Sequence, residues 1–254
     1  MAYACLMYHS LSDGRDPDPL YPRYTTTGTR FREHLLALGG EGYDLGSFGE
    51  LLRRLESGLP LPERYCVMSI DDGHRSGLEM AELMAAAGAT ATFFLTMDYC
   101  RDRPDFLKPQ EVRELAAAGF DFGTHGASHR ALSRMPRARM RAEIADSKAW
   151  LEDILGRGVA AMSLPAGQGD PDVYAAAYAS GYRLVGNSRE QLNAPGPVPR
   201  PVNRFVVLAG HDARQVCRIA GGSRPYMWRR RARAALLYLP KALLRTYDET
   251  RGRP

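Results

Sequence analysis

Short apolar runs alternate with helical patterns along most of the chain, and this alternation limits the possible folds more than any other feature. Seven runs predict strands, at residues 3–8, 65–70, 90–96, 120–123, 161–164, 182–185 and 205–208. Strands that alternate with helices form parallel βα units, which are covered on both faces of the sheet. The sequence therefore predicts an α/β fold, built as a barrel of parallel strands that is either complete or incomplete.

The segments between these runs show where helices and loops are expected. Ser47 and Glu50 have the spacing of a capping box, which predicts the start of a helix. The longest helix is expected over residues 137–155, where Gly156 is placed to end it. The proline-rich stretch 193–201 is predicted to be a loop, because proline interrupts helices and central strands.

The charge distribution divides the chain into two parts. Residues 223–254 hold nine basic and two acidic side chains, an excess larger than the net charge of +5 of the whole chain. We therefore expect a barrel domain over residues 1–222 and a basic, amphipathic helical tail over residues 223–254. Such a tail either docks on the barrel with its charges in solvent, or meets anionic lipid or a phosphorylated substrate. No nucleic-acid partner is expected, because no recognised binding module surrounds these residues.

The N-terminal segment and the cysteines bear on location. The chain begins without the basic and apolar regions of a secretory signal, and no apolar run reaches the ~20 residues of a membrane span. No cysteine has CxxC spacing, so buried free thiols are expected at Cys5, Cys66, Cys100 and Cys217. These features favour a cytoplasmic protein, with peripheral contact to the inner membrane face through the tail as the open alternative.

Polar residues directly follow several of the predicted strands. In parallel barrels, reactive side chains stand at the carboxyl ends of the strands, so residues at these positions are expected to meet at one mouth. The residues that follow the first, second, fourth and last strands are His9, Asp71 with Asp72, His125 with His129, and His211.

Two motifs within this set predict a metal site. Asp71 and Asp72 can serve one site only if the strand ends there and the chain turns, which Gly73 permits. His125 and His129 are separated by three residues, so both imidazoles can face one side of a helical turn or compact loop. Either motif alone is typical of a turn or of a polar surface. Together, each after a predicted strand, they predict a carboxylate and two imidazoles around a metal ion with open positions for water and substrate.

These motifs resemble those of the polysaccharide deacetylases of the NodB-homology type, carbohydrate esterase family 4. Ser69-Ile70-Asp71-Asp72-Gly73 resembles the T-F-D-D-G motif of that family. The run Thr124-His125-Gly126-Ala127-Ser128-His129 resembles its H-S/T-x-x-H region, with one more intervening residue. The resemblance extends over most of residues 4–220 and implies a distorted (β/α)7 barrel.

The resemblance also implies roles for single residues. Asp71 would be the catalytic base, and the ligands of a divalent metal, commonly zinc, would be Asp72, His125 and His129. A backbone N–H after the strand at 161–164, assigned to Ala166 beside Pro165, would bind the oxyanion. The chemistry agrees, because a metal lowers the pKa of a bound water and polarises an amide carbonyl, and a nearby carboxylate can take the proton of that water.

The sequence departs from the family pattern in its third motif. The family's R-x-P-x-G appears here as Ser163-Leu164-Pro165-Ala166-Gly167. The missing Arg orients the catalytic Asp in the family, so that task must pass to another group or be lost. Ala166 replaces an aromatic residue, which predicts a more open sugar site.

The general acid that protonates the leaving amine has two candidates. His211 stands in an L-x-x-H-like context, Leu208-Ala209-Gly210-His211, near the last strand. His9 ends the first strand at the barrel mouth, and a histidine there can change its charge near neutral pH.

We expect an enzyme that hydrolyses an N-acetyl group on an amino sugar. The expected substrate is a nucleotide-linked, lipid-linked or small glycoside intermediate of glycan or natural-product biosynthesis. Two alternatives stay open: a catalytically impaired, sugar-binding relative, which the missing Arg suggests, and an amidohydrolase that acts on a non-sugar C–N bond. The sequence does not indicate an oligomeric state.

Overall fold

The computed structural model describes residues 2–13, 22–223, 225, 226 and 228. The predicted tail over 223–254 therefore lies almost wholly outside the described residues, and its helical, basic character stays a prediction. Among the residues that are described, no helix is both long and apolar enough to cross a bilayer. All four cysteines are buried free thiols, as predicted.

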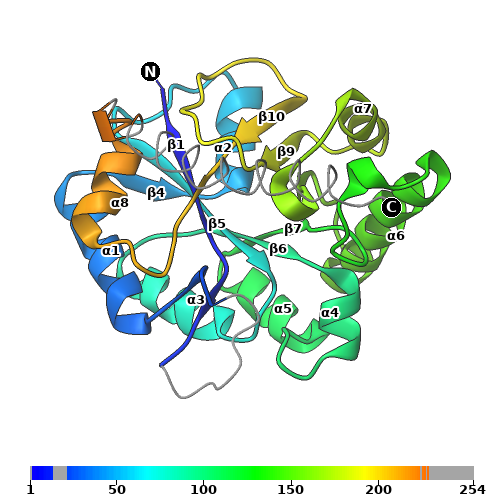
Figure 1. The fold of residues 1–254 in the computed structure, drawn as a ribbon, viewed down its shortest axis with the longest axis horizontal. Coiled ribbons are helices and arrows are strands. Elements are labelled where there is room, and N and C mark those ends of the chain that lie inside the picture. The colour runs from blue at the N-terminus through cyan, green and yellow to red at the C-terminus, as the bar shows by residue number, and fades with distance from the viewer. Residues whose placement is uncertain (1, 14–21, 224, 227, 229–254) are drawn as a thin grey trace, which may run out of the picture.

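Parallel strands form a nearly closed barrel (Figure 1). Their order is β10-β9-β8-β7-β6-β5-β1-β11, and all pairings along it are parallel. The seven predicted strands are all present, as β1 (Ala4–Tyr8), β5 (Tyr65–Asp72), β6 (Thr92–Leu95), β7 (Asp121–Thr124), β8 (Ala161–Ser163), β9 (Leu184–Asn187) and β11 (Phe205–Val206). The prediction of an α/β barrel is therefore confirmed.

Four further strands were not predicted, because none of them contains an apolar run. They are β2 (Ser10–Leu11), β3 (Thr25–Thr26), β4 (Asp44–Gly46) and β10 (Arg200–Asn203). The prediction of a loop over 193–201 is wrong for its last two residues, because β10 begins at Arg200. Pro201 is tolerated there because β10 ends the strand order, so its missing N–H interrupts no inner pairing.

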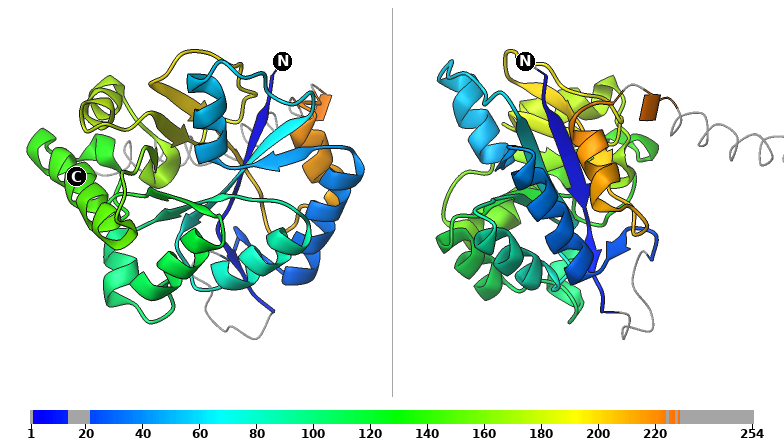
Figure 2. Two further views of the ribbon diagram at one scale, coloured as in Figure 1. Left: turned by 180° about the vertical axis from the view of Figure 1, so that it is seen from behind. Right: turned by 90° about the vertical axis from the view of Figure 1, so that its left-hand side faces the viewer.

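Helices cover the outer side of the sheet (Figure 2), except for the helix over residues 48–56, whose Phe48 and Leu51 pack on the inner cluster with Phe94. The helices are α1 (Gly28–Gly40), α2 (Phe48–Glu56), α3 (Gly77–Ala86), α4 (Met97–Asp102), α5 (Pro109–Ala117), α6 (Arg137–Leu155), α7 (Pro171–Ala179) and α8 (Ala213–Ala220), with short 3-10 helices η1 (Leu132–Arg134) and η2 (Pro165–Gly167). The predicted helix over 137–155 is confirmed, and Gly156 ends it with a φ of 64°. The Ser47 hydroxyl accepts the Glu50 N–H, but the Glu50 carboxylate pairs with Arg54 instead of completing a capping box.

Side chains of β5 alternate between two apolar layers. Val67 packs inside the barrel with Cys5 and Phe94 of neighbouring strands. Met68 and Ile70 belong to the larger cluster between the sheet and the helices. All eight residues of β5 are buried, as expected for a central parallel strand that is covered on both faces. The alternation carries Asp71 to the inner side of the barrel.

The barrel closes at a seam between the two ends of the strand order. β10 and β11 lie at opposite ends of that order, yet only Arg204 separates them in the chain. The Asn193 side chain joins the seam, because its amide bonds the backbone N–H and C=O of Asn203, each at 2.8 Å. The Asn193 backbone also pairs with Tyr3, next to β1. Arg204 therefore stands where the last strand returns to the first.

Candidate active site

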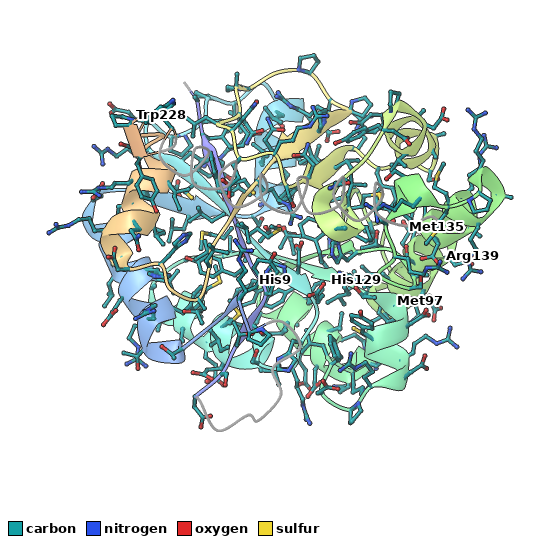
Figure 3. All side chains as sticks on the ribbon, viewed as in Figure 1. His9, Met97, His129, Met135, Arg139 and Trp228 are labelled. Carbon is teal, nitrogen blue, oxygen red and sulfur yellow. The ribbon has the colours of Figure 1, made fainter. Side chains whose placement is uncertain are left out.

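A cavity of about 340 Å³ lies at the carboxyl ends of the strands. In the view of Figure 3, His9 and His129 lie near the centre of the molecule. The residues that line the cavity are Met7, His9, Tyr24, Asp71, Asp72, His125, His129, Leu164, Ala166, Gly167, Ser188 and Val206. The structure thus brings together six of the site residues predicted from the sequence, which come from four different strand ends.

Asp72 enters the cavity because the backbone turns at this residue. In a regular strand its side chain would point away from that of Asp71, toward the helices. Asp72 instead has a φ of 75°, and Gly73 follows with a φ of 84°. The turn therefore begins one residue earlier than Gly73, on a non-glycine residue, and such strained backbone is typical of functional sites.

Asp72, His125 and His129 form a cluster that suits a metal ion. Asp72 Oδ1 lies 3.5 Å from His125 Nε2 and 3.1 Å from His129 Nε2, and the three possible ligand atoms all lie within 4.8 Å of one another. Ligand atoms of a tetrahedral zinc site are about 3.3 Å apart when each bond is near 2.0–2.1 Å. One carboxylate and two imidazoles are also a common ligand set for such ions, so the residues fit the implied metal.

The protonation of the two histidines follows from their surroundings. His125 Nδ1 lies 3.0 Å from the Ser163 carbonyl oxygen, to which it donates its proton, so Nε2 presents its lone pair to the cluster. Burial lowers the pKa of His125 to about 4. Burial also acts to lower the pKa of His129, but the hydrogen bond to Asp72 outweighs it and raises this pKa above 6.5.

Asp71 is bound by Arg204 and Ser163, and its Oδ2 also lies 3.8 Å from His125 Nε2. The guanidinium of Arg204 donates to both carboxylate oxygens, at 2.6 and 2.8 Å, and the Ser163 hydroxyl donates to Oδ2 at 3.0 Å. Arg204 also donates to the Ser163 oxygen at 2.6 Å. Burial acts to raise the pKa of Asp71, but the charge of Arg204 outweighs it and holds this pKa well below 3.8. Asp71 is therefore an ionised carboxylate in a fixed orientation.

Arg204 holds Asp71 in one orientation, which is the task that the resemblance assigns to the missing Arg of the third motif. It is fully buried, its Nε donates to the Asn187 carbonyl, and its guanidinium lies over the Phe94 ring at 5.5 Å. A Cβ on Gly186 would lie 2.9 Å from Arg204 Nε, so the glycine makes room for the side chain. Arg204 was not among the residues predicted for the site. The available signal was an arginine directly before the apolar run of the last strand, where a solvent-facing charge is not expected.

The two candidates for the general acid lie in different places. His9 lines the cavity and stacks on Tyr24, with ring centroids 4.8 Å apart. His211 is not among the described residues that line it. Its Nδ1 instead accepts the Leu208 N–H at 3.1 Å, and its carbonyl oxygen lies 2.9 Å from His34 Nε2. The structure therefore brings His9, and not His211, next to Asp71.

Ala166 and Gly167 line the same cavity and follow Pro165 in the chain. Ala166 has a φ of 59° and lines the cavity, which is a conformation that can turn a backbone N–H toward a ligand. Pro165 is buried and is not among the described lining residues. Its ring packs against the loop of the two histidines, because a Cβ on Gly126 would lie 3.1 Å from Pro165 Cγ.

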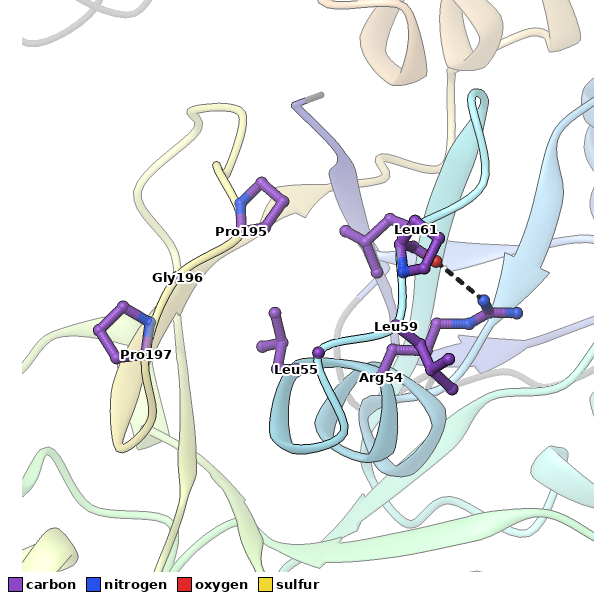
Figure 4. Close-up of a pocket in the computed structure, with 9 residues that line it drawn as sticks. Arg54, Leu55, Leu59, Leu61, Pro195, Gly196 and Pro197 are labelled. Atoms are coloured by element: carbon purple, nitrogen blue, oxygen red, sulfur yellow. Dashed lines mark hydrogen bonds between the residues drawn. The ribbon is translucent and has the colours of Figure 1, made fainter.

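A second cavity has no comparable chemistry. It measures about 390 Å³ and lies near the amino ends of the strands, between Leu59 and Pro197 (Figure 4). Its lining is apolar except for Arg54, which donates to the Pro60 carbonyl oxygen at 3.1 Å. The reactive groups are therefore at the opposite end of the barrel.

Comparison with known proteins places the chain among deacetylases. A family model described as polysaccharide deacetylase matches residues 59–185. The chain is 23% identical over 180 residues to a putative polysaccharide deacetylase, YxkH, of Bacillus subtilis, and the match covers 70% of this chain and 62% of that protein. The fold is similar to that of the Streptococcus pyogenes deacetylase PplD, solved with acetate, at a TM-score of 0.79 and 18% identity over 87% of this chain and 98% of that one. A de-N-acetylase of Aggregatibacter actinomycetemcomitans is similar at a TM-score of 0.77 and 18% identity, over 86% of this chain and 100% of that one.

Proposed function

The chain belongs to the polysaccharide deacetylase family, and from this premise we propose that it is a metal-dependent hydrolase that removes the N-acetyl group of an amino sugar. One observation carries the proposal. The adjacent carboxylates have different partners, since Asp72 faces His125 and His129 and Asp71 is held by Arg204. A hydrolytic site needs both a cation-binding carboxylate and a separate carboxylate that stays available as a base.

Asp72, His125 and His129 would hold the metal, which supplies Lewis acidity toward the amide carbonyl and toward a water molecule. Zinc is the metal we propose, because catalytic zinc sites of hydrolases use two histidines and a carboxylate and leave a position open for water. Asp71 lies beside this cluster, with Oδ2 3.8 Å from His125 Nε2, and receives the proton of the attacking water. Arg204 keeps the Asp71 carboxylate in one orientation beside the cluster, and because its charge lowers the pKa of Asp71, the carboxylate would pass the received proton on readily.

The other cavity residues would complete the reaction. The backbone N–H of Ala166 donates to the oxygen of the tetrahedral intermediate. His9 donates a proton to the departing sugar amine, and its stacking on Tyr24 fixes the plane of the imidazole. His9 is preferred over His211 because it lines the same cavity as Asp71.

The substrate class and the location of the protein are proposed from the sequence. The chain spans 62% of the length of the curated relative, whose whole activity is therefore only a guide. We expect from the sequence that the substrate is a nucleotide-linked, lipid-linked or small glycoside. We also expect that the protein is cytoplasmic and that the tail contacts membrane. The missing Arg suggested a catalytically impaired, sugar-binding relative as an alternative. Arg204 binds Asp71 in this structure, so the missing Arg no longer favours that alternative.

A substrate screen with a matched pair of variants tests the proposal. Acetate release would be measured on N-acetylated sugar nucleotides, lipid-linked sugars and aminoglycoside-like glycosides, with and without added zinc. We expect Asp71→Asn to lower the rate about 10²- to 10⁴-fold while metal content is retained. Asp72→Asn should lose the metal. Activity confined to amides without a sugar would favour the amidohydrolase alternative, and an unchanged rate in Asp71→Asn would contradict the proposed base.

A further inference from the structure

A buried carboxylate outside the cavity contacts the loop between the two histidines. Glu143 lies on α6, and the residue is only 1% exposed. A buried carboxylate is costly unless its oxygens accept hydrogen bonds. The hydrogen-bond partners of Glu143 therefore indicate which part of the structure its carboxylate stabilises.

Most of these partners belong to the histidine loop, residues 125–129. Glu143 Oε2 accepts the backbone N–H of Ala127 at 3.0 Å and of Ser128 at 2.8 Å. Oε1 accepts the Ser128 hydroxyl at 2.7 Å and the Arg139 guanidinium at 3.2 Å. Arg139 is largely exposed, so the buried contacts of the carboxylate are those to the loop.

The histidine loop is bound on its other side by α4. The Gly126 carbonyl accepts the Met97 N–H at 3.2 Å, and the Ala127 carbonyl accepts the Asp98 N–H at 2.9 Å. Glu143 therefore binds the N–H groups of the loop and α4 binds its C=O groups. Both sets of contacts lie between His125 and His129.

The loop has a conformation that needs such support. His129 has a φ of 60°, in the left-handed region that residues with a side chain rarely adopt. A residue held there is strained and persists only where its surroundings determine its conformation. Gly126, with a φ of 72°, also lies in this region.

We propose that Glu143 is a positioning residue of the metal site. By binding the Ala127 and Ser128 N–H groups, it holds the loop in the conformation that directs His129 Nε2 toward Asp72. Glu143 acts through the backbone and not through contact with the ligand atoms. This inference rests on the metal-binding role proposed above for Asp72, His125 and His129.

Zinc affinity of the full chain, measured by competition with a chromogenic chelator, tests the role of Glu143. Glu143→Ala should weaken zinc binding about 10- to 100-fold, the usual cost of losing a residue that orients metal ligands. Glu143→Gln should lose less than about tenfold, since its amide oxygen can accept both N–H groups and its NH₂ can donate to Ser128 Oγ. Ser128→Ala should lose about fivefold, for one hydrogen bond.

A control on the same helix separates positioning from general stability. Leu151 is fully buried on α6, about two turns beyond Glu143, and belongs to the apolar cluster between the sheet and the helices. Leu151→Ala should destabilise the fold without changing zinc affinity. Wild-type affinity in both Glu143→Ala and Ser128→Ala would overturn the inference, and so would equal losses in Glu143→Ala and Glu143→Gln, which indicate a role of charge alone. If Glu143→Ala does not fold, Ser128→Ala decides. A wild-type protein that binds no zinc would instead overturn the proposed function itself.

Discussion

Asp71 and Asp72 are adjacent in the sequence, yet they belong to two differently built halves of the site. The base side consists of Asp71, Ser163 and Arg204, and the metal side consists of Asp72, His125 and His129. A buried ion pair across the inside of the barrel holds the base side. A short loop bound through its backbone holds the metal side. Two identical side chains therefore acquire different chemistry from their different partners.

The two halves also differ in charge balance. On the base side, the negative charge of Asp71 is matched within the protein by Arg204. On the metal side, burial keeps His125 neutral near pH 7, and the hydrogen bond to Asp72 outweighs burial and raises the pKa of His129. A metal ion can therefore take the place of a proton on the metal side. On the base side, Arg204 already supplies the positive charge.

The largest expected effect comes from removing the cation of the base side. Arg204→Met leaves the Asp71 carboxylate buried without its partner, which should lower the free energy of unfolding by about 3–5 kcal/mol. Urea unfolding measures this loss. Arg214→Met, an exposed position on α8, is the control and should change stability by no more than about 0.5 kcal/mol. If zinc affinity falls as far as stability does, the two halves are not separate.

A smaller effect is expected when Arg204 is displaced instead of removed. In Gly186→Ala the added Cβ would lie 2.9 Å from Arg204 Nε, and this overpacking should cost about 1–3 kcal/mol of stability. Deacetylation should slow while zinc affinity stays unchanged. Gly39→Ala on α1, where a Cβ meets nothing within 4 Å, is the matched control and should retain full activity. A normal rate in Gly186→Ala would show that the position of the guanidinium does not matter.

The metal side should respond to pH through His129. Its pKa is raised above 6.5, so below that pKa a metal must displace a proton, and apparent zinc affinity should fall about tenfold, or ~1.4 kcal/mol, per pH unit. Above the raised pKa the affinity should level off. Titration calorimetry in buffers of different ionisation enthalpy counts the released protons: about one at acidic pH and near none at alkaline pH. Proton release that is independent of pH would contradict the assignment to His129.

The smallest expected effect concerns the hydroxyl on the base side. Ser163→Ala removes one hydrogen bond to Asp71, while both bonds from Arg204 to that carboxylate remain. Stability should fall by about 1 kcal/mol and the acetate-release rate by less than about tenfold. A loss as large as that in Arg204→Met would mean that Ser163, and not Arg204, took over the task of the missing Arg.

The residues of the metal side could be predicted from the sequence, whereas the partner of Asp71 could not. The metal side rests on short local motifs, so Asp72, His125 and His129 could be selected before the fold was known. The partner of Asp71 could not, because Arg204 is 133 residues away and reaches it only through the closure of the barrel. The turn at Asp72 was placed one residue late for a similar reason, since local rules assign positive φ to Gly73 before an aspartate.

The place of Arg204 at the seam has a consequence for the order in which the chain becomes competent. Residues 71–129, which include the proposed metal ligands, are synthesised well before residue 204. A nascent chain that ends before the seam therefore contains the proposed metal ligands but lacks the cation that pairs with Asp71. The carboxylate proposed as the base gains its partner only when the last strand closes the barrel.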